Sequence, residues 1–242
     1  MTDPHTYPSP DSARRDELAV RLAAVRQRIS AACEAAGRDV GEVTLIAVTK
    51  THPASDVRLL AGLGVRDIGE NRDAEAAPKA AQCAEENLTW HFIGQLQTNK
   101  CASVARYAAF VHSVDRMRLI RALGTAAGQA GRVIDCLVEV SLDGDPARGG
   151  APEAEVPALA EALAAEPGLV LGGVMAVAPL GMAPDRAFAK LGESAEVVRA
   201  VSPAATVISA GMSGDLEAAV VAGATHLRIG TALLGDRGPR VR

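Results

Sequence analysis

The lysine at position 50 is the residue of this sequence best placed for covalent chemistry. It ends the apolar segment LIAVTK, residues 45–50. A lysine that directly follows a buried strand is held away from bulk water, and desolvation lowers the pKa of its amine and makes it nucleophilic. Such an amine forms a Schiff base with an aldehyde. The alternative is an exposed lysine that begins a loop, which is the commoner case when only the local sequence is considered.

Two segments near the C-terminus carry the glycines and hydroxyls that bind phosphate. The segment SAGMSGD spans residues 209–215 and precedes a predicted helix, and RIGT spans residues 228–231. Backbone amides at helix N-termini bind phosphate well. A plain helix N-cap at Ser213 also explains the first segment, and both interpretations use the same amides. Together with Lys50, these loops predict an aldehyde that carries a phosphate, and pyridoxal 5′-phosphate (PLP) is a cofactor of this kind.

Arg228 is the cation predicted to face the same site. A buried guanidinium without an acceptor is costly, so Arg228 needs a partner. The pyridine nitrogen of PLP is one candidate. Because arginine has only donors and stays protonated, it would keep that nitrogen unprotonated and weaken the ring as an electron sink. The alternative partner is a carboxylate such as Glu70 or Glu139.

Other catalytic motifs are absent from the sequence. The five histidines show no metal-ligand spacing, and there is neither an HExxH motif nor a Walker A motif. Residues 211–215, GMSGD, miss the GxSxG nucleophile elbow because Asp215 replaces its last glycine. His91 lies on a predicted strand and is interpreted as a structural residue. No metal is predicted, and no catalytic residue is assigned.

The elements that position these residues follow from the apolar pattern. Residues 13–36 read as an amphipathic helix that Gly37 ends. After it, eight strand-like segments alternate with helical patterns. The strands lie within residues 43–50, 65–71, 88–94, 108–115, 133–142, 169–177, 205–213 and 224–231, and the helices within 54–63, 73–86, 98–106, 116–129, 156–165, 185–200 and 215–222.

This alternation predicts one α/β domain, a single (β/α)8 TIM barrel with an extra N-terminal helix. Alternating strands and helices favour parallel pairing, and the 242 residues suit a barrel of about 250. A dinucleotide-binding open sheet needs glycines after its first strand, where VTKTHP has none. The domain spans residues 13–242 after a flexible leader, residues 1–12. Whether the first helix caps the barrel or packs against its side stays open.

The composition of the chain limits which binding partners and which cellular compartment are expected. A formal net charge of -4 and 2% aromatic residues argue against nucleic-acid binding. No apolar run approaches the roughly 18 residues that span a membrane, and the N-terminus lacks a secretory h-region. The four cysteines form no CxxC pair and are expected to be buried thiols. The sequence therefore predicts a cytoplasmic protein, and the lack of an obvious exposed apolar stripe favours a monomer.

Five segments of the chain resemble the pyridoxal phosphate homeostasis proteins, also called the YggS or PROSC family. They run in order between residues 43 and 235 and read AVTKTHPASDV, IGENR, WHFIGQLQTNK, GGVMAVAPLG and SAGMSGDLEAAVVAGATHLRIGTALLG. The resemblance implies a barrel like the N-terminal domain of alanine racemase, with PLP held covalently by the lysine of an AV(S/T)K motif, here Lys50. It also implies a role in storing, buffering or delivering PLP, with apo-PLP enzymes as transient partners and no well-established turnover.

The resemblance also implies roles for individual residues. It implies that Arg228 faces the pyridine nitrogen of PLP and that Asn71 and Met175 line the ring. The residues implied to hold the phosphate end are Ser209, Met212, Ser213, Gly230 and Thr231. One position departs from the family pattern. Members often carry a lysine in the loop after the fifth strand, as in SGKSG, whereas this loop reads DGDPARGG with Arg148. Arginine does not form a Schiff base under normal conditions, so any transfer of PLP through this loop must differ.

Two enzymatic alternatives remain. A PLP-dependent amino-acid racemase on this barrel needs a second acid/base group, which alanine racemases take from a tyrosine in a second domain. This chain has only Tyr7, in the leader, and Tyr107, which is expected near the start of the fourth strand on the wrong face. A class I aldolase would use Lys50 to bind a sugar phosphate, but such enzymes usually carry the lysine on a later strand.

Overall fold

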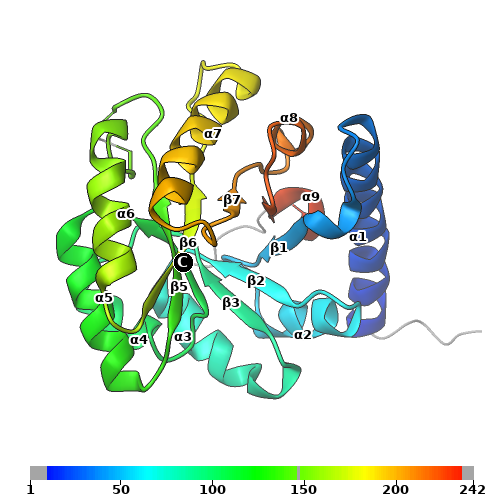
Figure 1. Ribbon diagram of the computed structural model, residues 1–242. Coiled ribbons are helices and arrows are strands. Elements are labelled where there is room, and N and C mark those ends of the chain that lie inside the picture. Colours follow the sequence, from blue (N-terminus) through cyan, green and yellow to red (C-terminus); the bar gives the residue numbers. More distant parts are fainter. Residues whose placement is uncertain (1–9, 146–147, 236–242) are drawn as a thin grey trace, which may run out of the picture.

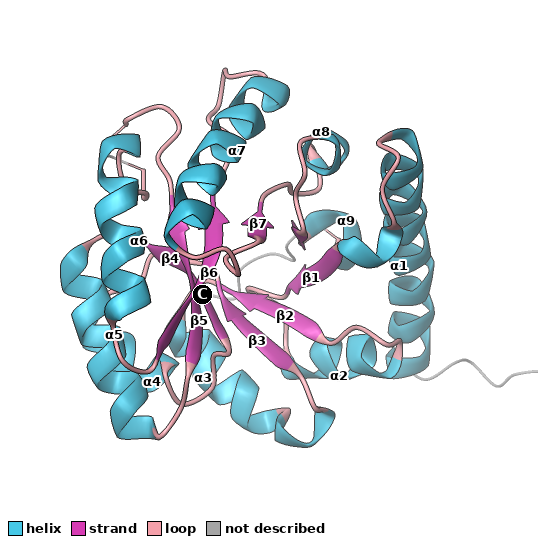
Figure 2. Cartoon of the chain, viewed as in Figure 1, coloured by secondary structure: helices cyan, strands magenta, loops and turns pink. Residues whose placement is uncertain are grey.

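Eight parallel strands close into a barrel around which the helices form an outer ring (Figures 1 and 2). The structure, a computed structural model, describes residues 10–145 and 148–235. Each strand pairs with the next along the chain, and β8 pairs with β1, which confirms the predicted (β/α)8 barrel. The strands are β1 (Thr44–Val48), β2 (Asp67–Glu70), β3 (Thr89–Phe92), β4 (Phe110–Val114), β5 (Ile134–Glu139), β6 (Leu169–Met175), β7 (Val207–Ser209) and β8 (His226–Ile229).

The helices follow the predicted order, with two differences. They are α1 (Pro10–Ala35), α2 (Ala54–Gly62), α3 (Asp73–Gln82), α4 (Cys101–Val104), α5 (Met117–Ala130), α6 (Val156–Ala165), α7 (Pro184–Val201), α8 (Leu216–Val221) and α9 (Thr231–Leu234). The helix expected over residues 98–106 is reduced to one 3-10 turn, Thr98–Lys100, followed by the short α4. The single turn α9 was not expected, and it places Gly230 and Thr231 at a helix start.

Helix α1 packs against the side of the barrel and does not cap it. It contacts α2, α8 and α9, as Figure 1 shows. Its buried stripe comprises Leu18, Leu22, Val25 and Ile29, the residues whose spacing predicted the helix. The helix begins at Pro10, so residues 10–12 belong to it and not to the expected leader. Residues 1–9 lie outside the described residues.

The barrel interior combines apolar packing with buried polar side chains. Most buried residues are alanine, valine, leucine and isoleucine, and Cys33, Cys83, Cys101 and Cys136 are buried free thiols, as predicted. No helix in the described part of the chain is both long and apolar enough to cross a membrane. The polar residues buried on the strands include Glu70, His91, His112, Ser209 and Arg228. Burying a polar group costs free energy unless it has a hydrogen-bond partner. Each of these side chains therefore needs such a partner.

Candidate functional site

The first strand delivers Lys50 to a cavity formed by the loops that follow the strands. Strand β1 ends at Val48, and the half-buried Lys50 lies in the turn after it. The cavity has a volume of about 350 Å³, within the range of small-molecule sites. Its lining comprises Val48, Lys50, Asn71, Ile93, Gly94, Val177, Met212, Ser213, Gly214, Arg228, Gly230 and Thr231.

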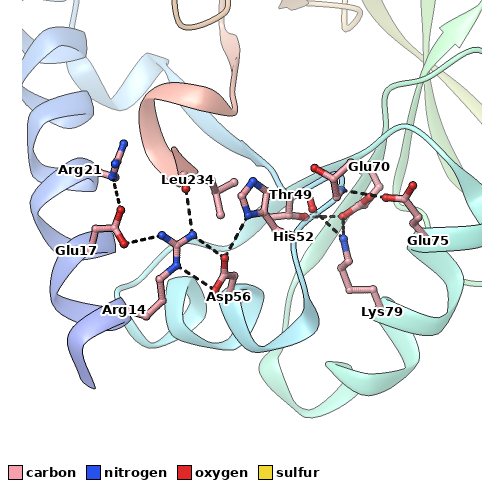
Figure 3. A network of polar contacts seen from close by, with 11 residues as sticks. Arg14, Glu17, Arg21, Thr49, His52, Asp56, Glu70, Glu75, Lys79 and Leu234 are labelled. Atoms are coloured by element: carbon pink, nitrogen blue, oxygen red, sulfur yellow. Dashed lines mark hydrogen bonds and ion pairs between the residues drawn. The ribbon is translucent and has the colours of Figure 1, made fainter. Parts of the chain in front are cut away.

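Thr49, the residue before Lys50, is held by a buried charged pair (Figure 3). Its hydroxyl donates to Glu70 Oε1 at 2.6 Å, and Lys79 Nζ donates to its carbonyl oxygen at 2.8 Å. Lys79 also pairs with Glu70 Oε1. Burial raises the pKa of Glu70, and the hydrogen bonds from Lys79 and Thr49 oppose that rise. The backbone that leads into Lys50 is therefore tied to both β2 and α3.

Thr51, the residue after Lys50, adopts a left-handed conformation with a φ of 69°. This conformation is unfavourable for a β-branched residue and persists only where its surroundings hold it. The Thr51 N–H donates to Glu75 Oε2 at 3.0 Å. Both neighbours of Lys50 are therefore restrained from α3, which limits where the lysine side chain can reach.

A second network holds the rest of this turn against the first helix (Figure 3). His52 Nδ1 lies 3.4 Å from the buried carboxylate of Asp56, and burial lowers the pKa of His52. Arg14 Nη2 donates to the same carboxylate at 2.7 Å and to the Leu234 carbonyl at 3.1 Å. Helix α1 thus links the turn after β1 to α9, the two segments that carry Lys50 and Thr231.

Arg228 is buried on β8 and is anchored by neutral acceptors. Its Nη1 donates to Ser209 Oγ at 2.7 Å and its Nη2 to the Ala176 carbonyl at 2.8 Å. Neither carboxylate considered as an alternative partner, Glu70 or Glu139, forms an ion pair with it in the described part of the chain; Glu70 pairs with Lys79. Burial lowers the pKa of Arg228 to about 10, so it remains a cation at neutral pH.

Two histidines continue this arrangement through the barrel interior. His112 Nδ1 lies 2.9 Å from Ser209 Oγ, and His112 Nε2 lies 3.0 Å from His91 Nδ1. His91 Nε2 lies 3.0 Å from Asp67 Oδ1. Both ring nitrogens of His91 are therefore satisfied, in agreement with its interpretation as a structural residue. Burial lowers the pKa of His112 well below its ordinary value, so His112 is neutral.

The loops after β7 and β8 place two hydroxyls at the cavity. Gly211, with a φ of 88°, turns the chain where a Cβ would meet the side chains of Ala219 and Leu227. Beyond this turn, Ser213 Oγ accepts a hydrogen bond from the Ala232 N–H at 3.1 Å. The Ser213 hydroxyl hydrogen is left for another acceptor, and Thr231 lines the same cavity.

A smaller cavity adjoins the site at Val177. Its volume is about 290 Å³, and its lining includes Glu139 and Arg148. Arg148 donates to Asp143 Oδ2 at 3.0 Å and to the Val177 carbonyl at 3.2 Å. Burial, together with the nearby carboxylate of Asp115, raises the pKa of Glu139 to about 7.

Seven of the nine predicted site residues line the larger cavity: Lys50, Asn71, Met212, Ser213, Arg228, Gly230 and Thr231. Met175 and Ser209 are not in its lining, and both are almost fully buried at the ends of β6 and β7. The Ser209 hydroxyl differs from the expectation because it is engaged with Arg228 and His112 inside the barrel.

Sequence reasoning missed the residues that support the site. Lys79 and Glu75 lie on a helix whose pattern showed no specific motif, and their role depends on the fold bringing α3 against the turn after β1. His112 could have been found, because His91 and His112 occupy neighbouring strands in the runs WHF and VHS. Their pairing depends on the register between β3 and β4.

Comparison with known proteins gives a consistent result. The family described as "Alanine racemase, N-terminal domain" matches residues 20–238. The pyridoxal phosphate homeostasis protein of Mycobacterium tuberculosis is 44% identical over 244 residues, covering 93% of this chain and 94% of the relative. The protein of the same name from Escherichia coli K12 is 36% identical, covering 92% and 97%. The chain belongs to the pyridoxal phosphate homeostasis protein family.

Solved structures agree with this family assignment. PipY of Synechococcus elongatus, in a structure with PLP bound, is 34% identical with a TM-score of 0.79, covering 90% of this chain and all of that one. The alanine racemase of Corynebacterium glutamicum has a TM-score of 0.67 at 17% identity and shares the fold. This chain covers 60% of that racemase.

Proposed function

We propose that this protein holds PLP as a Schiff base on Lys50 and acts in intracellular PLP homeostasis by storing, buffering or delivering the cofactor. One observation carries the proposal: Lys50, Arg228, Ser213 and Thr231 line the same cavity of about 350 Å³. The relatives that are named for this function align over nearly the whole chain, and PipY has PLP bound in its structure.

The cavity lining fits the chemical groups of PLP. Lys50 supplies an amine for the aldehyde, and Arg228 supplies a buried cation for an acceptor on the ring. Val48, Ile93 and Val177 give the cavity apolar walls, and the hydroxyls of Ser213 and Thr231 are donors for a phosphate. When bound, PLP supplies an electrophilic aldehyde and a conjugated ring.

The residues of this chain would favour retention of the cofactor over its use in catalysis. Arg228 is a permanent donor, and two of the five guanidinium N–H groups already bind Ser209 and Ala176. The remaining N–H groups can donate to the pyridine nitrogen and keep it unprotonated. The restraints on Thr49 and Thr51 keep the Lys50 amine at one wall of the cavity.

The alternative function is a PLP-dependent amino-acid racemase, and the described residues do not supply its second acid/base group. Among them, no tyrosine lines the cavity. Tyr107 lines a different cavity with Trp90, and its hydroxyl lies 3.4 Å from Asp73 Oδ1. Tyr7 lies outside the described residues. Assay of the PLP-loaded protein with D- and L-amino acids tests this alternative, and robust turnover would favour it.

We infer that Met175 and Ser209 support the proposed site without lining the cavity. The β6–β7 register pairs the two residues directly, and Ser209 anchors Arg228. We therefore assign Ser209 a role in holding the guanidinium and leave the phosphate to Ser213 and Thr231, together with the backbone near Met212 and Gly230.

The proposed partners and compartment follow the family role. We expect transient contact with apo-PLP enzymes, with Arg148 unable to take over PLP covalently. We expect no nucleic-acid or membrane partner. The buried free cysteines are typical of a reducing compartment, which favours the cytoplasm. The protein is expected to be a monomer, which light scattering of the purified full chain checks; a dimer mass would contradict this.

Visible spectroscopy tests the proposed function. Addition of PLP to the purified protein should give the absorbance of a Schiff base, and dialysis should remove it slowly. The Arg228→Met variant should retain the Schiff base but bind PLP less tightly. A protein that stays colourless with excess PLP would overturn the proposal.

A further inference from the structure

A continuous chain of hydrogen bonds crosses the barrel interior from the cavity to its opposite end. It runs from Arg228 through Ser209, His112 and His91 to Asp67, with heavy-atom distances of 2.7, 2.9, 3.0 and 3.0 Å. Its members come from β8, β7, β4, β3 and β2. The four members from Arg228 to His91 are almost fully buried. Asp67, at the start of β2, retains 26% of its side-chain exposure.

Hydrogen-bond chemistry fixes the direction of this chain. Arg228 has only donors, so Ser209 Oγ accepts from it and can donate its one hydrogen to His112 Nδ1. Neutral His112 then carries its proton on Nε2 and donates to His91 Nδ1. His91 in turn donates from Nε2 to the Asp67 carboxylate. Every donor thus points from Arg228 towards Asp67.

The reverse direction is less favourable on two grounds. It requires either a protonated Asp67 that donates to His91 Nε2, although Asp67 is partly exposed to water, or a second proton on the fully buried ring of His91. It also makes Ser209 accept from both Arg228 and His112, which leaves its hydroxyl hydrogen without a partner in the chain. A buried donor left unpaired costs free energy, so the direction from Arg228 to Asp67 prevails.

We propose that Ser209, His112, His91 and Asp67 form a positioning relay, which holds the Arg228 guanidinium in one orientation against the ring of the bound cofactor. The inference rests on the proposed function because Arg228 faces the PLP cavity. In a directional chain each bond polarises the next, so the Asp67 carboxylate strengthens the acceptor that Ser209 offers to Arg228. The relay thereby couples a carboxylate at the opposite end of the barrel to the ring nitrogen of PLP.

Other charged and titratable groups surround the relay without belonging to it. Asp135 and His226 face His91, and the His226 ring centroid lies 6.2 Å from that of His91. His226 Nδ1 is bound to Thr225 Oγ1 at 2.9 Å. The carboxylates of Glu139 and Asp215 act electrostatically on Arg228. His226 is therefore a matched control, since it lies beside the relay but outside the bonded chain.

The first test uses the protein without PLP and does not depend on the proposed function. Long-range ¹H–¹⁵N spectra of the full chain report which imidazole nitrogen carries the proton. The relay predicts a proton on Nε2 of both His91 and His112, and a neutral His112 between pH 5 and 8. A proton on Nδ1 of either histidine, or a charged His112, would overturn the assigned direction and with it the relay.

The second test uses PLP labelled with ¹⁵N at the ring nitrogen. In the loaded protein, Asp67→Asn and His112→Phe should move the ring ¹⁵N shift by more than it changes in the wild type between pH 5 and 8. His112→Phe should also raise the Kd for PLP about tenfold, as expected if the Arg228 guanidinium loses its charge-assisted contact with the ring of PLP. His226→Gln should leave the shift and the Kd unchanged.

The two tests separate failure of the inference from failure of the proposed function. If the wild type binds no PLP, the proposed function fails, and the imidazole spectra still decide the relay. If both relay variants bind PLP with an unchanged ring ¹⁵N shift, the inference is wrong and PLP binding stands. A merely structural role for His112 would lower the melting temperature and leave the shift unmoved. Asp67 is partly exposed, so Asp67→Asn is the variant expected to keep the fold, which its melting temperature checks.

Discussion

The hydroxyl of Thr49 donates a 2.6 Å hydrogen bond to the buried carboxylate of Glu70, which ties the residue before Lys50 to the end of the neighbouring strand. Lys79 completes this contact by binding both the carboxylate and the Thr49 carbonyl. Glu70 Oε2 has no hydrogen-bond partner among the described residues. The position of Lys50 therefore depends on the buried Glu70–Lys79 pair. Burial of each charge costs free energy, and the opposite charge of the partner offsets that cost.

Removing Lys79 should destabilise the protein strongly. Lys79→Met leaves Glu70 buried without a counter-charge, and breaking a buried pair from one side costs about 3–5 kcal/mol. We expect a fall of that order in the free energy of unfolding, measured with urea. The double variant Glu70→Gln/Lys79→Met removes both charges and should recover most of the loss. Equal losses in the single and double variants would contradict this account of the pair.

Glu139 should make stability fall as pH rises. Its pKa is about 7 in the folded protein against 4.5 in its ordinary state. Between these values the folded state keeps a proton that the unfolded state releases, so the free energy of unfolding falls with increasing pH, by at most about 3 kcal/mol. Urea unfolding of the PLP-free protein between pH 4.5 and 8 measures this dependence. Glu139→Gln should flatten the profile and gain stability above pH 7, whereas the exposed Glu155→Gln should not.

The backbone of Asn71 should tolerate no side chain at Gly94. A Cβ at Gly94 would lie 2.2 Å from the Asn71 carbonyl oxygen and 2.7 Å from its Cα. Gly94→Ala should therefore displace the Asn71 backbone, cost about 1–3 kcal/mol in unfolding free energy and weaken PLP binding. Gly128→Ala on α5 has open space around its Cβ and should stabilise the helix by about 0.5–1 kcal/mol. Unaltered PLP affinity in Gly94→Ala would argue against Asn71 as a cavity residue.

The phosphate end of the site should show selectivity between two forms of the cofactor. Thr231→Val and Ser213→Ala remove hydroxyls from the cavity and should weaken PLP binding, by about tenfold for the loss of a bond to a charged group. Pyridoxal, which lacks the phosphate, should bind these variants and the wild type equally well. Fluorescence titration with both ligands measures the difference. An equal loss of affinity for pyridoxal would mean that the Ser213 and Thr231 hydroxyls contact a part of the cofactor other than the phosphate.

The barrel was predictable from the sequence because its alternating strand and helix patterns are local. Helix α6, Val156–Ala165, has the predicted bounds, and every predicted strand segment contains an observed strand. Short elements were harder to predict from the sequence. Helix α9 has four residues, too few for a helical period to show in the sequence. Pro10 begins α1 although its neighbours in the sequence read as a leader.

The candidate site was predictable where a residue follows a strand end, as Lys50 and Thr231 do. Contacts between strands were not predictable, because they depend on register and on which way each side chain points. Ser209 shows the difference. It belongs to the motif that predicted phosphate binding, but it is the last residue of β7 and its hydroxyl is engaged inside the barrel. Gly211 then turns the chain so that Ser213, two residues after it, reaches the cavity.

Borohydride reduction of the PLP-loaded protein, followed by peptide mapping, identifies the lysine that holds PLP. We expect one stable adduct, a phosphopyridoxyl group on the Lys50 side chain, and no adduct in Lys50→Ala under the same conditions. Lys100→Ala, which removes a lysine from another cavity of the same barrel, should leave the Lys50 adduct intact. An adduct that persists at another lysine in Lys50→Ala, with Lys50 unmodified in the wild type, would contradict the assignment of Lys50 as the residue that holds PLP.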